Sequence, residues 1–193
     1  MKLIFSSKEK RDILKSWIVI SLAFGILLSE KYSFNLILQN FLISFATAGV
    51  GFLIHELAHK YAAQRYRYFA EFRADNKMLL IALVSSFFGF LFAAPGGVMI
   101  DGGTDRRKFG NIAAAGPLMN IIIAIIFLIL GFFNAGILKT VADYGFSINS
   151  WLALFNLIPI FPFDGAKIIQ GNKKIYFSLV VFSIVLMVIT GFR

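Results

Sequence analysis

The sequence has 193 residues, of which 59% are hydrophobic, 15% are charged and none is cysteine. A chain this apolar excludes an ordinary water-soluble protein, and the lack of cysteine excludes disulfides and thiolate metal ligands. The net charge of +9 comes from Lys and Arg at the ends of apolar runs, as in cytoplasmic loops of membrane proteins, so nucleic-acid binding is not indicated. Residues 1–193 are therefore predicted to form one integral membrane domain.

Six apolar segments follow one another along the chain and predict an all-α, multi-pass membrane protein. The basic N-terminal stretch leads into the first segment without a clear small-x-small cleavage site, which favours a retained helix over a signal peptide. The six segments lie at about residues 13–29, 34–64, 78–95, 111–133, 146–163 and 175–192.

The second segment ends in an H-E-x-x-H motif, His55-Glu56-Leu57-Ala58-His59. Residues four apart lie on one face of a helix, so His55 and His59 can bind one metal ion. Glu56 can then reach a metal-bound water and take its proton. A chance match is the alternative. Because two imidazoles and a carboxylate are costly within hydrocarbon, a functional metal site is favoured.

The third segment ends in a way that does not suit a plain helix. Pro95, Gly96 and Gly97 follow small residues and precede a β-branched one. This composition favours an extended edge or a tight hairpin that dips into the membrane within residues 78–100. Non-helical backbone at that depth must be buried in protein or line a wet cavity. An ordinary sixth spanning helix is the alternative.

The distribution of Lys and Arg distinguishes these two topologies. With six crossings and the N-terminus inside, twelve of the 19 basic residues lie on the inner side. With five crossings and a dipping third segment, only Lys31, Lys139 and Arg193 lie outside. The positive-inside rule favours the second arrangement in a cell membrane. It puts the N-terminus and the ends of the second and fifth segments on the cytoplasmic side.

The fourth segment contains the sequence AAAGPLMN, which ends at Asn120. Small residues allow helices to approach closely, and an asparagine within an apolar segment requires a polar partner. From the residues alone, a structural hydrogen bond between helices accounts for Asn120.

The fifth segment ends with Asp164, which elimination selects as a third metal ligand. Catalytic zinc sites take three protein ligands and leave one position to water, and this chain has no cysteine and no third histidine. Asp164 is the one acidic residue besides Glu56 that ends a strongly apolar run, although an aspartate at the membrane edge is the alternative. Pro159 and Pro162 predict unwound chain there, with freed carbonyls that Asn156 can satisfy.

Three motifs in this order resemble the site-2 protease family of intramembrane zinc metalloproteases: HELAH at 55–59, AGPLMN at 115–120 and NLIPIFPFDG at 156–165. The resemblance covers a catalytic core of about residues 34–170, flanked by the helices at 13–29 and 175–192. It implies one zinc ion per chain, with these roles: His55, His59 and Asp164 as ligands, Glu56 as general base, Asn120 as a contact of the substrate or its oxyanion, and Gly96 and Gly97 in a substrate-binding strand.

By this resemblance the protein is expected to be a zinc-dependent endopeptidase that cleaves a transmembrane or membrane-anchored protein within the lipid bilayer. It resembles a short form of the family, without a PDZ or other appended domain. Two other functions remain open. One is an inactive relative that acts as a membrane scaffold, and the other is a small metal transporter that uses His55, His59 and Asp164 as a transit site.

Overall fold

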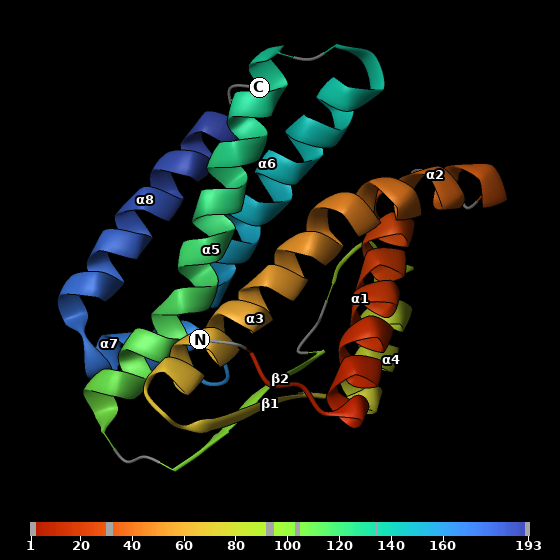
Figure 1. The fold of residues 1–193 in the computed structure, drawn as a ribbon. Helices are drawn as coiled ribbons and strands as arrows, with labels where there is room; N and C mark the ends of the chain where they lie inside the picture. Colours follow the sequence, from red (N-terminus) through yellow and green to blue (C-terminus); the bar gives the residue numbers. More distant parts are fainter. Residues whose placement is uncertain (1–2, 30–32, 92–94, 103–104, 134, 192–193) are drawn as a thin grey trace.

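The computed structural model describes residues 3–29, 33–91, 95–102, 105–133 and 135–191. Eight α-helices account for most of the described residues (Figure 1): α1 (Ser7–Leu27), α2 (Phe34–Ser44), α3 (Val50–Arg65), α4 (Asn76–Ser86), α5 (Arg106–Phe133), α6 (Gly136–Asn156), α7 (Asp164–Gly171) and α8 (Lys173–Gly191). A π-helical turn, η1 (Phe45–Gly49), joins α2 and α3 into one continuous helix. Two strands, β1 (Phe69–Ala74) and β2 (Gly96–Asp101), form an antiparallel pair.

Three helices of the described chain are long and apolar enough to cross a membrane: the continuous helix Phe34–Arg65, α5 and α8. They support the predicted helical membrane protein. The helices α1 and α6 were also predicted to span and have 21 residues each, but they do not meet this criterion. Charged residues fill the first turns of α1, and Lys139 and Asp143 lie in α6. The predicted count of about five spans therefore stays a prediction.

Helices α1 and α5 begin earlier than their apolar segments because polar residues start them. Ser6 caps α1 by accepting a hydrogen bond from the Glu9 backbone N–H at 3.1 Å. At α5, Asp105 accepts from the backbone of Arg107 at 2.9 Å. Helix α6 begins ten residues before the predicted position 146 without a side-chain cap, since Ala135 precedes it. At α1 and α5, hydrophobicity locates the apolar part of the helix, whereas the capping residue determines where the helix starts.

The third apolar segment forms α4, which has 11 residues and is too short to span a bilayer, at about 16 Å. The extended chain predicted around Gly96 is present as β2. Its partner β1 was not predicted. Residues 92–94 of this segment, as well as Lys31 and Arg193, lie outside the described residues.

The register of the two strands brings the C-terminal end of α3 close to the N-terminal end of α5. Phe69, shortly after α3, pairs with Asp101, shortly before α5, and Ala74 pairs with Gly96 at the other end. At Gly96 the backbone φ is +137°, and an added Cβ would lie 2.2 Å from the Arg73 carbonyl oxygen. Only glycine fits there, and Gly96 therefore allows β2 to begin in close contact with the backbone of β1.

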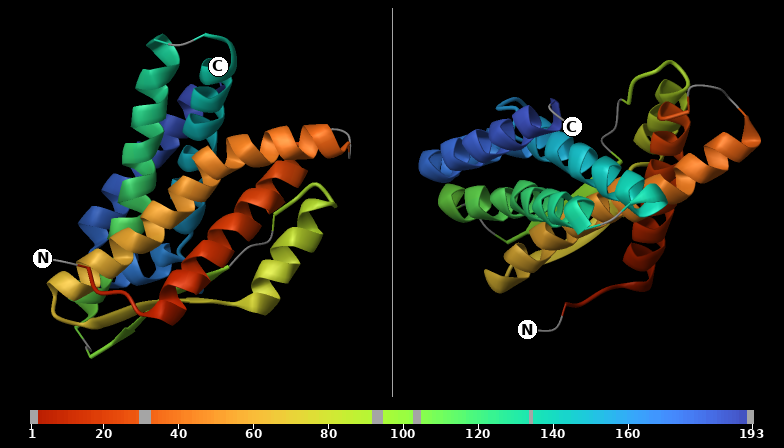
Figure 2. Two further views of the ribbon diagram at one scale, coloured as in Figure 1. Left: turned by 45° about the vertical axis from the view of Figure 1, so that its right-hand side comes forward. Right: turned by 90° about the horizontal axis from the view of Figure 1, so that it is seen from above.

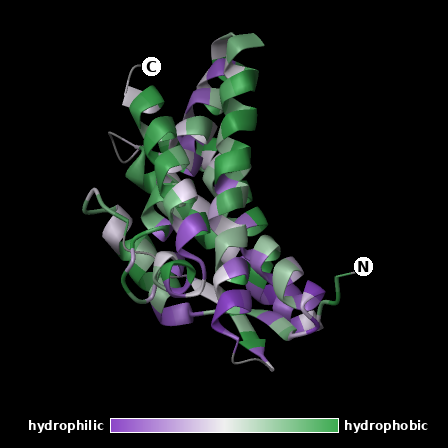
Figure 3. Ribbon diagram, turned by 90° about the vertical axis from the view of Figure 1, so that its left-hand side faces the viewer, coloured by the Kyte–Doolittle hydropathy of each residue, from purple (hydrophilic) through white to green (hydrophobic). Residues whose placement is uncertain are grey.

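The helices form two groups that meet along α3 (Figure 2). Helices α5, α6, α7 and α8 share a buried apolar cluster that includes Ile121, Phe146 and Leu179. Helices α1 and α4 share a smaller cluster around Ile20 and Leu79. In Figure 3 hydrophobic residues colour most of the long helices, whereas hydrophilic residues gather at the end where the strands lie.

A buried ion pair fixes α1 to α3 and to β1. The Lys60 ammonium donates to both oxygens of Glu9, at 2.6 and 2.5 Å, and the Phe72 backbone N–H donates to Glu9 Oε1 at 2.9 Å. Glu9 is 0% and Lys60 is 1% exposed. Because neither charge reaches solvent, each needs the other to compensate for its lost hydration.

We expect Glu9→Ala to destabilise the fold by about 3–5 kcal/mol, because it leaves the Lys60 charge buried and unpaired. Thermal unfolding in detergent, followed by circular dichroism, measures the loss. Lys108→Ala is the control: it breaks an exposed pair with Asp105 and is expected to cost less than about 1 kcal/mol. Equal melting temperatures for the two variants would contradict the role of the buried pair.

Candidate metal centre

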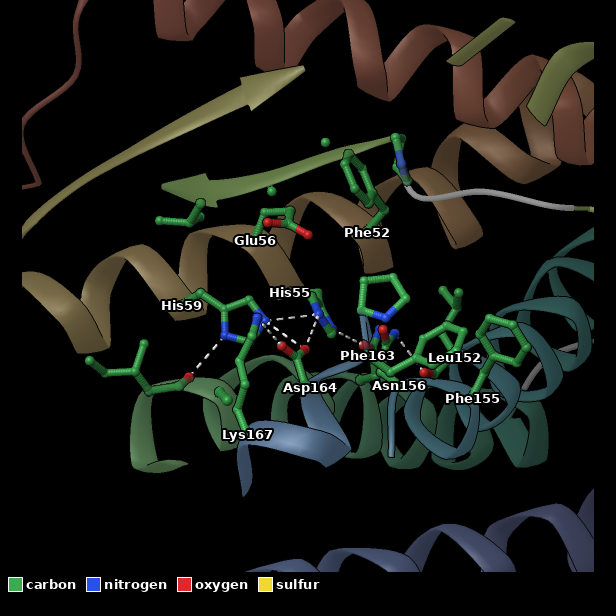
Figure 4. Close-up of a pocket in the computed structure, with 18 of the residues that line it drawn as sticks. Phe52, His55, Glu56, His59, Leu152, Phe155, Asn156, Phe163, Asp164 and Lys167 are labelled. Carbon is green, nitrogen blue, oxygen red and sulfur yellow. Dashed lines mark hydrogen bonds and ion pairs between the residues drawn. The ribbon is translucent and has the colours of Figure 1, made fainter. Parts of the chain in front are cut away.

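Three side chains predicted as metal ligands converge on one point (Figure 4). The Asp164 Oδ2 atom lies 3.0 Å from His59 Nε2 and 3.2 Å from His55 Nε2, and the two Nε2 atoms are 3.0 Å apart. Ligand atoms in a tetrahedral zinc site lie about 3.3 Å from one another, given bonds of about 2.0–2.1 Å. The donor set and the spacing of this triad therefore fit zinc.

Two local features bring the triad together. The i, i+4 spacing in α3 points both imidazoles to the same side of the helix. Helix α6 ends at Asn156, and the non-helical residues 157–163 bring Asp164 back as the first residue of α7. Pro159 and Pro162 lie in this stretch, as predicted.

Gly116 of α5 makes room for the two imidazoles. A Cβ atom at this position would lie 2.4 Å from His59 Nε2 and 2.5 Å from His55 Nε2. The glycine of the AAAGPLMN sequence thus lets α5 pass directly behind the two nitrogen atoms that would hold a metal. The sequence indicated close helix contact here, but not that histidines make it.

Gly116→Ala is therefore expected to weaken zinc binding by at least about tenfold, because the added methyl group displaces the Nε2 atoms from their positions. Zinc content after purification and affinity by chelator competition measure the effect. Gly191→Ala, where an added Cβ meets nothing within 4 Å, is the control. Unchanged zinc affinity in Gly116→Ala would contradict this geometry.

The outer nitrogen of each imidazole is also engaged. His59 Nδ1 donates to the Ile112 backbone carbonyl at 2.9 Å, and His55 Nδ1 lies 2.5 Å from Asn120 Oδ1. Carbonyl oxygens only accept, so both Nδ1 atoms carry hydrogen and both Nε2 atoms present a lone pair to the shared point. This is the tautomer that metal-binding histidines require.

Glu56 borders the same site. Its Oε2 atom is enclosed and has no hydrogen-bond partner among the described residues. It faces a cavity of about 450 Å³ that also borders His55, His59 and Asp164. Figure 4 shows Glu56 on the side of the histidine pair that is nearer to β2. A buried carboxylate oxygen without a protein partner beside three metal-binding groups is suited to accept a proton from a water molecule.

A cation lies beside the Asp164 carboxylate. Lys167, on the next turn of α7, places its ammonium 3.5 Å from Asp164 Oδ1 and borders the cavity.

The other predicted site residues lie at different distances from the triad. Gly96, Gly97, Asn156 and Pro162 border the cavity, whereas Pro159 is not among its lining residues. Asn156 donates to the Leu152 carbonyl at 2.9 Å. Asn120 also borders the cavity, contacts His55 and is 0% exposed.

Sequence reasoning missed three contributors to the site: Gly116, Lys167 and Asn149. Asn149, on α6, hydrogen-bonds to Asn120. It had a usable signal, since it is an asparagine within an apolar segment, as Asn120 is. Lys167 follows Asp164 by three residues, one helical turn, and its position could have been inferred once α7 was expected to start at Asp164.

Two curated proteins of Methanocaldococcus jannaschii are similar to this chain. One, named "Putative zinc metalloprotease MJ0611", is 37% identical over 177 residues, which cover 89% of this chain and 88% of that protein. The other, named "Zinc metalloprotease MJ0392", is 34% identical over 129 residues, 65% of this chain but 33% of that longer protein. No family model matches the chain, and no solved structure matches it significantly.

Proposed function

Because the chain belongs to the family of zinc metalloproteases that includes these relatives, we propose that it is an intramembrane endopeptidase of the site-2 protease type. The observation that carries the proposal is the buried triad of His55, His59 and Asp164 beside Glu56, whose Oε2 atom has no hydrogen-bond partner among the described residues. Its substrate is a transmembrane or membrane-anchored protein, cut within the bilayer.

Each residue of the site has a distinct task in peptide-bond hydrolysis. His55, His59 and Asp164 hold zinc, which when bound polarises the scissile carbonyl and lowers the pKa of a water molecule. Glu56 takes the proton of the attacking water and returns it to the leaving amine. Apolar residues from α1, α5 and α6 line the cavity and keep bulk water from the reacting groups.

The substrate binds in an extended form along β2. No second strand pairs with the outer edge of β2 in the described chain, and residues 96–100 border the cavity. An added Cβ at Gly97 would meet nothing within 4 Å, so the face of β2 is open at this residue. A transmembrane helix must unwind locally before cleavage, and strand addition would hold the unwound segment.

A membrane arrangement with five spans and the α4–β2 region as a dipping element agrees with the strand register. Pairing of Phe69 with Asp101 keeps the end of α3 and the start of α5 on one side. Tyr66 and Asn111 are joined across the same region by a 3.1 Å hydrogen bond. We propose that this side, which carries the N-terminus and most basic residues, is cytoplasmic.

Single cysteines test this arrangement, because the chain has none of its own. Arg73→Cys and Arg107→Cys are expected to react with a membrane-impermeant thiol reagent from the same side of sealed vesicles. Labelling from opposite sides would refute the dipping element.

Metal removal tests the reaction itself. The purified protein and a membrane-anchored reporter are placed together in lipid vesicles, and cleavage is followed before and after treatment with a zinc chelator. Cleavage is expected to stop on zinc removal and to return when zinc is added back. Cleavage that is insensitive to the chelator would contradict the proposal.

A further inference from the structure

A row of hydrogen bonds connects His55 to the backbone of α6. His55 Nδ1 lies 2.5 Å from Asn120 Oδ1, and Asn120 Nδ2 donates to Asn149 Oδ1 at 3.0 Å. Asn149 Nδ2 in turn donates to the Gly145 carbonyl at 2.9 Å. Both asparagines are 0% exposed. The row therefore joins α3, α5 and α6 through two fully buried amides.

Two backbone carbonyls, those of Gly145 and Gly51, determine the direction of the bonds in this row. The Gly145 carbonyl only accepts, so Asn149 must turn its NH₂ group to it and its oxygen to Asn120. Asn120 must then turn its NH₂ group to Asn149 and its oxygen to His55. The His55 Nδ1 atom consequently carries hydrogen, which leaves the Nε2 lone pair for the metal site.

The two imidazoles differ in how their tautomer is fixed. His59 Nδ1 faces the Ile112 backbone carbonyl, which is an acceptor in any arrangement of the side chains. His55 Nδ1 faces an amide group, which could present either its oxygen or its nitrogen. Only the tautomer of His55 depends on side chains beyond its direct partner.

A glycine on α3 makes room for the Asn149 side chain of α6. A Cβ atom at Gly51 of α3 would lie 2.0 Å from Asn149 Oδ1, so the glycine allows the asparagine to reach Asn120. The Gly51 carbonyl also accepts from Asn120 Nδ2 at 3.4 Å. Both hydrogens of the Asn120 amide are thus used within the protein, and none is left for a substrate oxyanion.

We propose that Asn149 and Asn120 are positioning residues, which fix the tautomer and the ring orientation of His55 for zinc. The inference rests on the proposed zinc site, and it assigns Asn120 a role through His55 in place of the substrate contact that the family resemblance implies. Asn120 and Asn156 both border the cavity, and the Asn156 amide is the one without a bond to His55.

Asn149→Leu removes the acceptor that orients Asn120 while nearly preserving its shape. We expect zinc affinity, measured by chelator competition on the purified full chain, to fall by about 10–100-fold. Asn149→Asp keeps an acceptor oxygen toward Asn120 and is expected to bind zinc within about threefold of wild type. Ser150→Ala is the matched control, since Ser150 is also 0% exposed and bonds to the carbonyl four residues back, at 2.8 Å.

The tautomer itself can be observed, because the chain has only two histidines. Zinc-loaded protein with ¹⁵N-labelled histidine is expected to show two hydrogen-bonded Nδ1–H signals. In Asn149→Leu the His55 signal should shift or be lost through exchange, whereas the His59 signal should not change. Loss of both signals together would show general disruption and contradict a specific role.

Asn120 variants test the same inference if Asn149→Leu does not fold. Asn120→Asp keeps an acceptor for His55 Nδ1 and should bind zinc at least as tightly as wild type, whereas Asn120→Leu should bind it about 10–100-fold more weakly. Zinc binding that is equal in all variants would overturn the inference and leave the proposed function standing. A wild-type protein that binds no zinc would instead overturn the proposed function.

Discussion

Glu56→Gln is expected to keep its zinc and to lose peptide-bond cleavage by about 10²–10⁴-fold. Glutamine has nearly the shape of glutamate, so the cavity and the triad of His55, His59 and Asp164 should persist. Its amide cannot accept the proton of the attacking water. Zinc content and the rate of reporter cleavage, measured on the same purified protein, separate these two effects.

The control for this variant is Glu71→Gln on β1, which bears a carboxylate that contacts Ser6 and Arg73 and does not border the cavity. It should cleave the reporter at the wild-type rate. If Glu56→Gln cleaves as fast as wild type, Glu56 is not the general base. A scaffold or a metal transporter would depend on the triad but not on Glu56. Zinc transport that Glu56→Gln does not affect would favour the transporter.

Asp164→Ala is expected to abolish cleavage and to weaken zinc binding by more than about 100-fold. Loss of a residue that only hydrogen-bonds to a metal ligand already weakens metal binding by about 10–100-fold, and Asp164 is itself the proposed ligand. The variant removes the only negatively charged ligand and leaves two neutral imidazoles, which do not complete a catalytic zinc site. Zinc affinity and reporter cleavage should fall together, in contrast with Glu56→Gln.

The matched control is Asp105→Ala, at the start of α5. Asp105 accepts from the backbone N–H groups of Arg107 and Lys108 as a helix cap, so its loss should cost about 1 kcal/mol of stability without affecting zinc. This control separates destabilisation from ligand loss. Zinc affinity unchanged by Asp164→Ala would mean that another residue completes the site.

The sequence predicted the parts of the site that depend on local geometry. His55 and His59 share a helix face because of their spacing alone, so no knowledge of the fold was needed. Asp164 could be selected because the chain offers few acids at the ends of apolar runs, and Pro159 and Pro162 indicated the unwound stretch before it. The structure brings these three side chains together as a group that could hold a metal ion.

The parts that were missed depend on how separate helices pack. Gly116 looks like any small residue in a helix contact until its neighbours are known to be two imidazoles. Asn149 lies 29 residues from its partner Asn120, and no local pattern joins them. Strand β1 is six residues long and carries Glu71 and Arg73, so it looked like a polar loop. Its partner β2 comes only after α4 in the chain, so no local pattern indicates that the two strands pair.

The position of the cut in a membrane-anchored substrate tests the central claim most directly. A reporter with one transmembrane helix is incubated with the protein in lipid vesicles, with zinc present, and the products are identified by mass spectrometry. We predict a single cut within the apolar segment, made by the wild-type protein and not by Glu56→Gln. Cuts confined to the water-exposed flanks, or products that Glu56→Gln also forms, would contradict intramembrane proteolysis at this site.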